Sequence, residues 1–504
     1  MCLADLLEVH SRADPAAPAI LSPGRPPLTY GELSARTHQA VHTLRGLGIA
    51  ATDRVAVALP RGADSALALL AVATAAACVP INPDLTADEL LRYFSELKLT
   101  ALVTRAEANS ASRDVARSLG IAVIEFVPGA NDDPADYKLM SSAIGPAVAG
   151  GASRGEDDAF ILLTSGTAAR PKMVPLTHAN VCLSAYNAGH VLSLAPHDCL
   201  LLVLPLFHAH GLISGLLTAL AAGSSVICTD GFDVVSFFGW MKEWRPTWYT
   251  AVPTIHRALL TAAEQDPERA RPSSLRVIRS ASSSLAPAIL EGLEAMFGVP
   301  VLETYGMTEA ASQIAANPFE LRKVGSVGRA AGPEIAIMDE AGTLLRAGEA
   351  GEIVVRGANV TRGYVDNPEA NARSFTNGWF RTGDQGRIDD DGYVRIIGRI
   401  KEMINRGGEK VSPLEVDVVL MEHPAVLTAL TFSMPHDMLG EEVAAAVVLK
   451  EGKTLTEREL RDFAGKHLVH YKVPHRIVFV SELPRGPTGK LQRIGLARKL
   501  GLCP

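Results

Sequence analysis

The apolar and polar positions of the first 300 residues alternate in a way that predicts short strands separated by helices. Apolar positions recur at helical spacing over residues 29–47 and 63–77. The short apolar runs that we predict as buried strands are residues 54–59, 101–104, 122–127, 159–166 and 198–206. Strands of this kind, separated by helices, are typical of parallel sheets that helices cover. We therefore expect an α/β fold for this part of the chain.

The pattern changes further along the chain. A stretch rich in Gly, Ala, Ser and Asp, residues 131–155, predicts a loop. After Val324 the chain contains short strands with Gly and Asp turns, which predicts a small β-rich subdomain. The strands predicted in it are residues 334–339, 351–357 and 393–399. Beyond Arg399 strand-like and helical pieces alternate again, which predicts a final α+β unit.

The composition excludes several classes of protein. With 47% hydrophobic and 20% charged residues, the chain is neither disordered nor fibrous. A net charge of −7 argues against a dedicated nucleic-acid binder, but it is compatible with a local site for a small anion. The longest apolar run, residues 66–79, is mostly alanine and too short to span a bilayer. The six cysteines lack metal-ligand spacing and the first residues do not resemble a signal peptide, so we expect a cytoplasmic protein with reduced thiols.

The first motif with chemical meaning is LLTSGTAARPKMVPLTH, residues 162–178. The residues of interest after its buried strand are Thr164, Ser165, Gly166, Thr167 and Lys172. Small hydroxyl residues and glycine let backbone N–H groups close around phosphate oxygens, and the lysine adds a positive charge. The spacing is not that of the Walker motif. A polar turn would explain any four of these residues, whereas the whole string favours phosphate binding.

The second motif is VLETYGMTEAA, residues 301–311. Its strand would deliver residues 304–308 to the edge at which α/β sheets bind ligands. Tyr305 can stack on a base, Thr308 can donate to a phosphate, and Glu309 is an oxygen ligand suited to Mg²⁺. A capped helix start is an equally simple explanation of Thr308 and Glu309 taken alone.

Three further motifs gain their meaning in combination with the first two. In WFRTGDQG, the carboxylate of Asp384 can accept the hydroxyls of a ribose. In GRIKEMINRGGEKVSPLEV, Arg399 is a candidate phosphate or ribose partner, and Gly407 and Gly408 permit close approach of the backbone to a ligand. Lys490 lies in the Gly- and Pro-rich string LPRGPTGKLQR. Taken alone, these motifs are explained as a turn, a glycine hairpin and a solvated lysine.

The five motifs, in this order, resemble the adenylate-forming superfamily of acyl-CoA synthetases, carrier-loading domains and luciferases. The resemblance extends from about residue 28 to the end of the sequence. Within the superfamily the chain is similar to oxalate–CoA ligases, on the strings LPLFHAHGL, WYTAVPTIH, IRSASSSLAP, ANVTRGYVDNPEAN and INRGGEKVSPLEVD. This resemblance implies an ATP-dependent ligase that activates a small carboxylic acid as an acyl-adenylate. It would then transfer the acyl group to CoA, releasing AMP and pyrophosphate, with Mg²⁺ as cofactor.

The resemblance also implies a division of the chain. Residues 1–398 would form the adenylate-forming domain for ATP and the carboxylate, built from helix-covered sheets and the small β-rich subdomain. Residues 399–504 would form a small mobile α+β domain that carries Lys490. Lys401 matches the family's hinge position, and the two glycines 407–408 match the loop that reaches the CoA tunnel. This C-terminal part has more basic than acidic residues, the sign expected of a unit that approaches ATP and CoA.

The resemblance further assigns the residues of the ATP site. The loop from Thr164 to Lys172 would hold the β- and γ-phosphates. Thr308 would contact the α-phosphate, Glu309 the Mg²⁺ ion, and Lys490 both the substrate carboxylate and the α-phosphate. The residues implied for the adenine pocket and the ribose are Ser282, Ser283, Ser284, Thr304, Tyr305, Gly306, Asp384 and Arg399.

The acid site is expected to be small and polar. Oxalate is a compact dianion whose second carboxylate needs several hydrogen-bond donors, and His208, His210 and Ser282 are available for it. His208 would either favour the thiolate of CoA or only gate the pocket. His210 would either contact the acid or be a buried histidine with satisfied ring nitrogens.

Some residues depart from the family pattern. Ala168 and Ala169 stand where most relatives have Thr-Gly, and Met173 stands where glycine is common. Losing the hydroxyl at 168 removes one phosphate donor. The alternatives left open are a ligase for short- or medium-chain fatty acids or aryl acids, an enzyme that loads a carrier protein, and a non-catalytic nucleotide-binding relative. We expect no nucleic-acid partner and no membrane span, with a homodimer as one alternative for the assembly.

Overall fold

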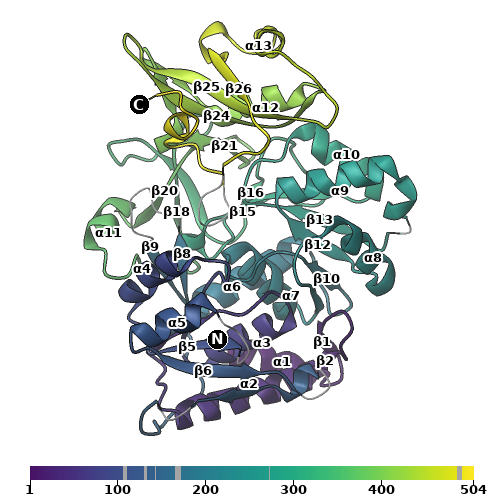
Figure 1. The fold of residues 1–504 in the computed structure, drawn as a ribbon, viewed down its shortest axis with the longest axis vertical. Coiled ribbons are helices and arrows are strands. Elements are labelled where there is room, and N and C mark those ends of the chain that lie inside the picture. The colour runs from purple at the N-terminus through teal and green to yellow at the C-terminus, as the bar shows by residue number, and fades with distance from the viewer. Residues whose placement is uncertain are drawn as a thin grey trace.

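The fold combines a large α/β body with a smaller sheet at one end of the long axis (Figure 1). The computed structural model describes residues 1–105, 110–129, 133–141, 144–164, 172–271, 273–484 and 491–503. These residues form four sheets of seven, nine, five and five strands. In Figure 1 the two larger sheets lie in the lower and middle parts, and the last hundred residues lie at the top.

The seven-stranded sheet is built mainly from the first 180 residues. In spatial order its strands are β7 (Lys138–Met140), β6 (Ala122–Val127), β5 (Ala101–Arg105), β3 (Arg54–Val57), β4 (Ala77–Pro80), β8 (Asp158–Thr164) and β9 (Lys172–Thr177). The inner strands are parallel, and the edge strands β7 and β9 are antiparallel to their neighbours. Thr164 and Lys172 are therefore direct partners across β8 and β9.

The nine-stranded sheet contains the strand that leads to the second motif. Its strands in spatial order are β16 (Arg329–Ala330), β15 (Ala315–Ala316), β14 (Val301–Tyr305), β13 (Val277–Ser280), β12 (Trp248–Ala251), β10 (Cys199–Leu202), β11 (Ser225–Cys228), β1 (Pro18–Leu21) and β2 (Leu28–Thr29). From β14 to β1 the pairing is parallel, so the carboxyl ends of β12, β13 and β14 meet at one edge.

Helices connect and cover these two sheets. They are α1 (Leu3–Ala13), α2 (Tyr30–Gly46), α3 (Ala63–Ala75), α4 (Ala87–Leu97), α5 (Ala111–Ser118), α6 (His178–Val191), α7 (Thr218–Ala221), α8 (Val234–Trp244), α9 (Pro253–Gln265) and α10 (Pro287–Phe297). Short 3₁₀ turns are η2 (Pro134–Asp136), η4 (Pro267–Ala270) and η5 (Thr308–Ala310). Thr29 and Thr177 begin α2 and α6 with capping boxes, in which each threonine hydroxyl accepts a backbone N–H of the first turn.

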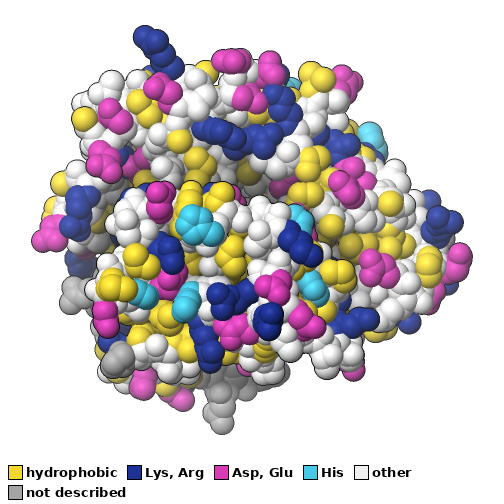
Figure 2. All heavy atoms as spheres, turned by 90° about the horizontal axis from the view of Figure 1, so that it is seen from above, with side chains coloured by type: hydrophobic (Ala, Val, Ile, Leu, Met, Phe, Trp, Pro, Cys, Tyr) yellow, Lys and Arg dark blue, Asp and Glu magenta, His cyan; other side chains and the backbone are white. Residues whose placement is uncertain are grey.

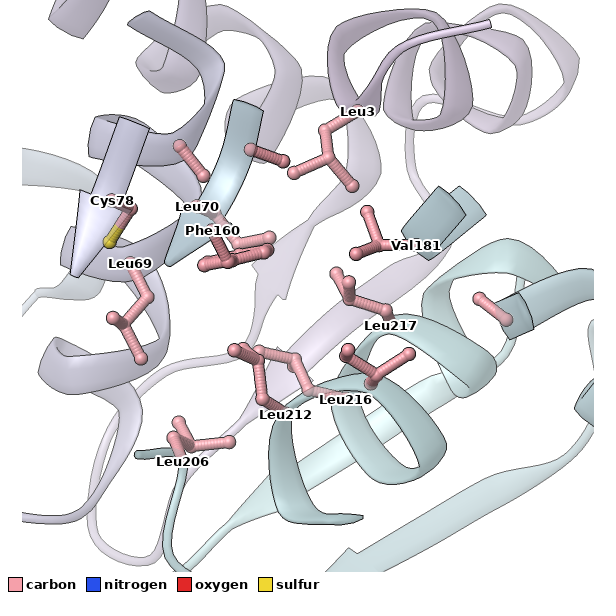
Figure 3. Packing of buried hydrophobic residues seen from close by; sticks show 14 of the residues in the cluster. Leu3, Leu69, Leu70, Cys78, Phe160, Val181, Leu206, Leu212, Leu216 and Leu217 are labelled. Carbon is pink, nitrogen blue, oxygen red and sulfur yellow. The ribbon is translucent and has the colours of Figure 1, made fainter. Parts of the chain in front are cut away.

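One large core joins the two sheets (Figure 3). Helix α3 is buried along its whole length because it packs against α2 on one side and against β3 and β4 on the other. Its small alanines allow this close approach. Figure 3 shows Leu69 and Leu70 of α3 near Phe160 of β8, with Val181 of α6 and Leu216 close by. Among the described residues, no helix is long and apolar enough to cross a membrane.

Two antiparallel units follow. The five-stranded subdomain sheet contains β17 (Glu334–Met338), β18 (Gly351–Arg356), β19 (Phe375–Thr376), β20 (Trp379–Ile388) and β21 (Val394–Arg399), with α11 (Pro368–Ser374) beside it. The C-terminal sheet contains β22 (Ile404–Arg406), β23 (Glu409–Val411), β24 (Val426–His436), β25 (Gly440–Leu449) and β26 (Arg476–Phe479). The helical pieces of this last part are η6 (Ile400–Glu402), α12 (Pro413–Glu422), α13 (Glu457–Ala464), η7 (His470–Lys472) and α14 (Leu496–Lys499). Two hydrophobic clusters of its own lie against the C-terminal sheet.

The predicted α/β fold with its small β-rich subdomain is confirmed, but two local predictions differ from the structure. Residues 131–155 are not only a loop, because β7 adds to the edge of the seven-stranded sheet through β6. The strand expected at 198–206 is shorter, since β10 ends at Leu202. The strand predicted at 159–166 agrees with β8 as far as Thr164, and residues 165 and 166 lie outside the described residues.

Beyond β10, residues 210–217 form a π-helix, η3 (His210–Leu217), which the apolar pattern did not predict. A π-helix has i→i+5 hydrogen bonds and is often found at functional sites. The face seen in Figure 2 shows basic and acidic side chains interspersed rather than a surface of one sign.

Candidate active site

The end of β14 places the second motif in a tight loop. Gly306 follows the strand, and a Cβ at this position would lie 1.6 Å from the carbonyl oxygen of Ser312. Only glycine therefore fits here. Ala311 and Ser312 have φ values of +48° and +79°, so the loop turns back sharply through two left-handed residues. Asn359 Nδ2 donates to the carbonyl oxygens of Ala310 and Gln313, at 3.0 and 2.8 Å, and so stabilises the turn.

This loop holds Glu309 in a buried position. Its side chain is 7% exposed, and Tyr364 Oη donates to its Oε1 at 2.8 Å. The backbone N–H of Thr361 donates to the carbonyl oxygen of Glu309 at 2.7 Å. Tyr364 thus holds the carboxylate and Thr361 holds the backbone of Glu309, while the preceding Thr308 is only partly buried.

Lys172 lies on the other side of Tyr364. Its Nζ is 4.2 Å from the centroid of the Tyr364 ring. Burial lowers the pKa of Lys172, and the nearby carboxylate of Glu309 opposes that shift. The positive charge of Lys401, in η6, lowers the same pKa further. The structure therefore brings together Lys172 of the predicted phosphate loop, Glu309 of the predicted metal site and Lys401 of the predicted hinge.

A second group forms where β20 meets β21. Asp384 and Arg399 are register partners across the two strands, and Arg399 Nε lies 2.7 Å from Asp384 Oδ1. Tyr305 Oη donates to Asp384 Oδ2 at 2.5 Å. The aspartate is 3% exposed, and burial raises its pKa although Arg399 and Tyr305 oppose the shift. Gly383, with φ +75°, turns the strand just before the aspartate. Three residues that the sequence assigned to the nucleotide thus form one contact group.

The serine loop after β13 faces the π-helix. His210 Nδ1 is 2.9 Å from Ser282 Oγ, and His210 Nε2 is 2.7 Å from Thr250 Oγ1. Ser282 has φ +76° and is exposed, as are Ser283 and Ser284. The structure therefore links two of the predicted acid-binding residues. It also gives both ring nitrogens of His210 a partner, although the histidine is partly exposed and not fully buried as one of the two interpretations expected.

Other predicted residues are placed less closely together. His208 is half-buried, and its ring packs edge-on against Phe207 at 4.6 Å between centroids. Thr304 is buried, with its hydroxyl donating to the carbonyl oxygen of Ser280 at 3.2 Å. Gly407 and Gly408, with φ values of +60° and +98°, form the turn between β22 and β23.

The glycine turn belongs to the C-terminal sheet in this structure. The N–H of Gly407 donates to the carbonyl oxygen of Leu439 at 2.9 Å, and the N–H of Gly408 donates to Asn405 Oδ1 at 3.2 Å. Both partners lie in the C-terminal part of the chain. The described contacts therefore do not join this turn to Lys172 and Glu309. The predicted residues Ser165, Gly166, Thr167 and Lys490, with Ala168 and Ala169, lie outside the described residues.

The sequence alone did not single out several residues of this region. Tyr364, which contacts both Lys172 and Glu309, lies in a quoted string but was assigned no role. Arg279, Thr250 and Gln313 form a buried polar group behind His210. Arg279 lies in the short strand β13 and was assigned no role, although its charge was an available signal.

A magnesium ion at this place would depend on Glu309. Among the described residues, no group of three or more His, Cys, Asp or Glu side chains could hold a metal ion by itself. Mg²⁺ in nucleotide sites is usually held by one or two carboxylates together with substrate phosphates, so a single carboxylate fits that mode of binding.

Comparison with known proteins places this geometry in a family. Residues 7–365 match the AMP-binding enzyme family, and residues 415–490 match its C-terminal domain. The chain is 41% identical over 502 residues to an oxalate–CoA ligase from Arabidopsis thaliana, covering 97% of each protein. It is 36% identical to a sulfoacetate–CoA ligase from Cupriavidus necator, covering 98% of this chain and 97% of that protein. The crystal structure of ATP-bound MatB from Rhodopseudomonas palustris superposes with a TM-score of 0.88 at 30% identity, covering 99% of both chains. The chain therefore belongs to the AMP-binding enzyme family.

Proposed function

We propose that this protein joins oxalate to CoA at the expense of ATP. Its class, an AMP-forming acid–CoA ligase, follows from the family and from the near-full-length likeness to acid–CoA ligases. In the first half-reaction a carboxylate oxygen attacks the α-phosphorus of ATP and pyrophosphate leaves. In the second the CoA sulfur attacks the acyl carbon, the bond to the phosphate oxygen breaks, and AMP leaves. The observation that carries oxalate as the acid is the 41% identity to the Arabidopsis oxalate–CoA ligase over 97% of both proteins.

The first half-reaction brings two anions together, and positive charge must offset their repulsion. Lys172 is suited to this role by its position, since its Nζ lies over the Tyr364 ring that also contacts Glu309. Burial and the neighbouring Lys401 lower its pKa, and a bound polyphosphate would oppose this shift and favour the charged form. Lys490 would bridge the attacking carboxylate and the α-phosphate, and Thr308 would donate to the latter. No general base is needed, since the attacking carboxylate is ionised at neutral pH.

The remaining nucleotide contacts follow the same assignment. Glu309 would hold Mg²⁺ together with phosphate oxygens, and the ion would supply neutralising charge there. Asp384 and Arg399 would hold the ribose, and their mutual ion pair keeps both side chains in place before ATP binds. The residues proposed around the β- and γ-phosphates and the adenine are Thr164, Ser165, Gly166, Thr167, Ser282, Ser283, Ser284, Thr304, Tyr305 and Gly306.

The second half-reaction would use residues of the C-terminal part. We place the domain boundary at residues 398–399, with residues 399–504 as the unit that moves and Lys401 at its hinge. Its rotation would carry Lys490 away and bring the turn of Gly407 and Gly408 to CoA. Two features support this division: the separate hydrophobic clusters of the C-terminal sheet and its separate family match, residues 415–490. His208 would then act on the thiol or gate the entrance of the pocket.

The test is a substrate panel with purified protein. Pyrophosphate release would be measured with oxalate, malonate, sulfoacetate, butyrate, octanoate and coumarate, and thioester formation with free CoA and with a phosphopantetheinyl carrier protein. We expect the highest kcat/KM for oxalate, with CoA as acceptor. A preference for octanoate or coumarate would reject oxalate, and product formation that requires the carrier would reject CoA. Lys490→Ala is expected to abolish adenylation, and unchanged turnover in that variant would reject the proposed chemistry.

A further inference from the structure

Arg279 is a buried arginine whose described partners are all neutral. It lies in β13 and is 1% exposed. Its Nη1 donates to Thr250 Oγ1 at 3.2 Å, and its Nη2 donates to Ser214 Oγ at 3.2 Å and to Gln313 Oε1 at 3.1 Å. Burial lowers the pKa of Arg279 to about 9, so the guanidinium still carries its charge at neutral pH. A buried charge is normally paired, and this one is paired with no carboxylate among the described residues.

The first arm from Arg279 leads to the serine loop. A guanidinium can only donate hydrogen bonds, so Thr250 Oγ1 accepts from Arg279, and the same oxygen lies 2.7 Å from His210 Nε2. In the neutral tautomer of His210 with its proton on Nδ1, Thr250 donates to Nε2, and Nδ1 donates to Ser282 Oγ at 2.9 Å. The hydroxyl proton of Ser282 is thereby directed away from His210. Because Ser282 is exposed, this proton can reach a ligand.

The other two arms have the same direction. Ser214 Oγ accepts from Arg279 and donates to Ser312 Oγ at 2.8 Å, so the proton of Ser312 is directed onward. The carbonyl oxygen of Gln313 accepts from Arg279, which fixes the orientation of its amide. The amide Nε2 of Gln313 is buried and has no hydrogen-bond partner among the described residues. A buried donor without a partner is costly and calls for an acceptor.

All three arms therefore start at one buried cation and end in a donor. Two of the arms pass through residues of the π-helix η3, one through His210 and the other through Ser214. A carboxylate that accepts several donors near a desolvated guanidinium is stabilised in its charged form. A neutral or purely apolar acyl group would leave the same donors unpaired, and this would select against it.

We propose that Arg279 sets the direction of these three arms so that Ser282, Ser312 and Gln313 present donors to the distal carboxylate of a short dicarboxylic acid. Arg279 is then a positioning residue that determines specificity, and it acts through Thr250, Ser214 and Gln313 without contacting the acid. The inference rests on the proposed acid–CoA ligase function and deepens it. It makes the second negative charge of the acid, rather than its small size alone, the feature that the enzyme selects.

The experiment compares oxalate with oxamate, in which a neutral amide replaces the distal carboxylate. Pyrophosphate release would give kcat and KM for both acids and KM for ATP in the wild type, in Arg279→Met and in Thr250→Val. Arg45→Met is the matched control, because Arg45 is also a buried arginine, with 5% of its surface exposed. It donates to the carbonyl oxygens of Ile49, Ala75 and Gly151, and none of these residues belongs to the three arms.

We expect Arg279→Met to lower the oxalate-to-oxamate ratio of kcat/KM about 30-fold, mainly through KM for oxalate, with KM for ATP unchanged. Thr250→Val breaks one arm and leaves the buried charge, so it should lower the ratio about 5-fold, and Arg45→Met should leave it unchanged. The inference is overturned if Arg279→Met and Thr250→Val keep the wild-type ratio, or if they weaken oxalate, oxamate and ATP alike. Should Arg279→Met fail to fold, the ratio in Thr250→Val decides by the same criterion.

Failure of the proposed function would be seen separately, in the wild type. If the wild type prefers malonate, oxalate is rejected as the substrate but the inference about Arg279 still stands. The ratio of kcat/KM for malonate to that for malonamate is then measured in the same variants. A wild type that turns over only monocarboxylic acids overturns both.

Discussion

Asp384 and Arg399 face each other across β20 and β21, with Arg399 Nε 2.7 Å from Asp384 Oδ1, and Tyr305 donates to the same carboxylate from a different sheet. The pair therefore joins the end of β14 to the last strand before the C-terminal sheet. A nucleotide held here would contact both parts of the chain.

Asp384→Asn is expected to raise KM for ATP about 10- to 100-fold, because charged hydrogen bonds to the ribose and to Arg399 are lost together. The fold should remain, since the amide keeps the shape of the side chain. KM for ATP would be measured by pyrophosphate release at saturating acid. Asp389→Asn is the control, because Asp389 forms an ion pair with Lys323 beyond the end of β20. Equal KM values in the two variants would remove Asp384 from the ATP site.

The close packing around Gly306, at the end of β14, gives a second prediction. Gly306→Ala would force a Cβ against the carbonyl oxygen of Ser312 and displace the turn that carries Thr308 and Glu309. We expect a loss of about 3 kcal/mol in the free energy of unfolding and little remaining adenylation. Denaturant unfolding and pyrophosphate release would measure the two effects.

Gly239→Ala provides the comparison for that variant. Gly239 lies in α8, and a Cβ there would meet no atom within 4 Å. Its replacement by alanine should be neutral or slightly stabilising. If both variants unfolded at the same denaturant concentration, the close contact at Gly306 would not constrain the loop.

The turn between β22 and β23 should matter for the second half-reaction alone. Gly408 has φ +98°, so Gly408→Ala costs about 1–2 kcal/mol of backbone strain and distorts the turn. We expect thioester formation to fall while single-turnover pyrophosphate release stays near the wild-type rate. Gly452→Ala, at φ +70° after β25, introduces similar strain elsewhere in the C-terminal part. Loss of both half-reactions in Gly408→Ala, or equal effects of the two substitutions, would contradict the assignment to CoA.

The free energy of unfolding at acidic pH should depend on His178, the first residue of α6. Its side chain is fully buried, the N–H of Leu3 donates to its Nδ1 at 3.2 Å, and burial lowers its pKa to about 4. Unfolded histidine has a pKa of about 6.5, so below that pH the unfolded chain takes up a proton that the folded chain does not. The stabilisation is thus complete above pH 6.5 and is lost as the pH falls towards 4, by about 3 kcal/mol in all.

His178→Gln should remove this dependence, because glutamine does not titrate. Urea unfolding at pH 7.5 and 4.5 would show a smaller difference between the two pH values for the variant than for the wild type. His42→Gln, at an exposed position of α2, should leave the difference unchanged. An unaltered pH difference in His178→Gln would place the acid sensitivity in other groups.

Strong apolar runs predicted the sheets well, whereas pairing at their edges could not be read from the sequence. The buried strands β3, β5 and β6 coincide closely with their apolar runs. Strand β7 was missed because its three residues alternate in burial within a polar stretch and pair only at an edge. The π-helix was missed because its apolar residues have no spacing that distinguishes them from a buried strand or α-helix.

The candidate site shows a similar limit. Motifs identified Tyr305, Asp384 and Arg399 separately, but the hydrogen bond between Tyr305 and Asp384 joins residues 79 apart in the sequence. Tyr305 was expected to stack on a base, and nothing in the sequence indicated that its hydroxyl would bind a carboxylate. Arg279 was overlooked because its position in the sequence does not show whether its charge is buried or exposed. Only the tertiary packing of β13 against the π-helix shows that it is buried.

The π-helix η3 would make the proposed acid site sensitive to chain length as well as to residue type. A π-helix accommodates more residues per turn than an α-helix, so deleting one residue between His210 and Leu217 would let the segment relax to α-helical winding. That rewinding would shift His210 and Ser214 relative to each other and so change their contacts with Thr250 and Arg279. A single-codon deletion in this segment would therefore alter the proposed acid contacts without removing any residue that is assigned to ATP.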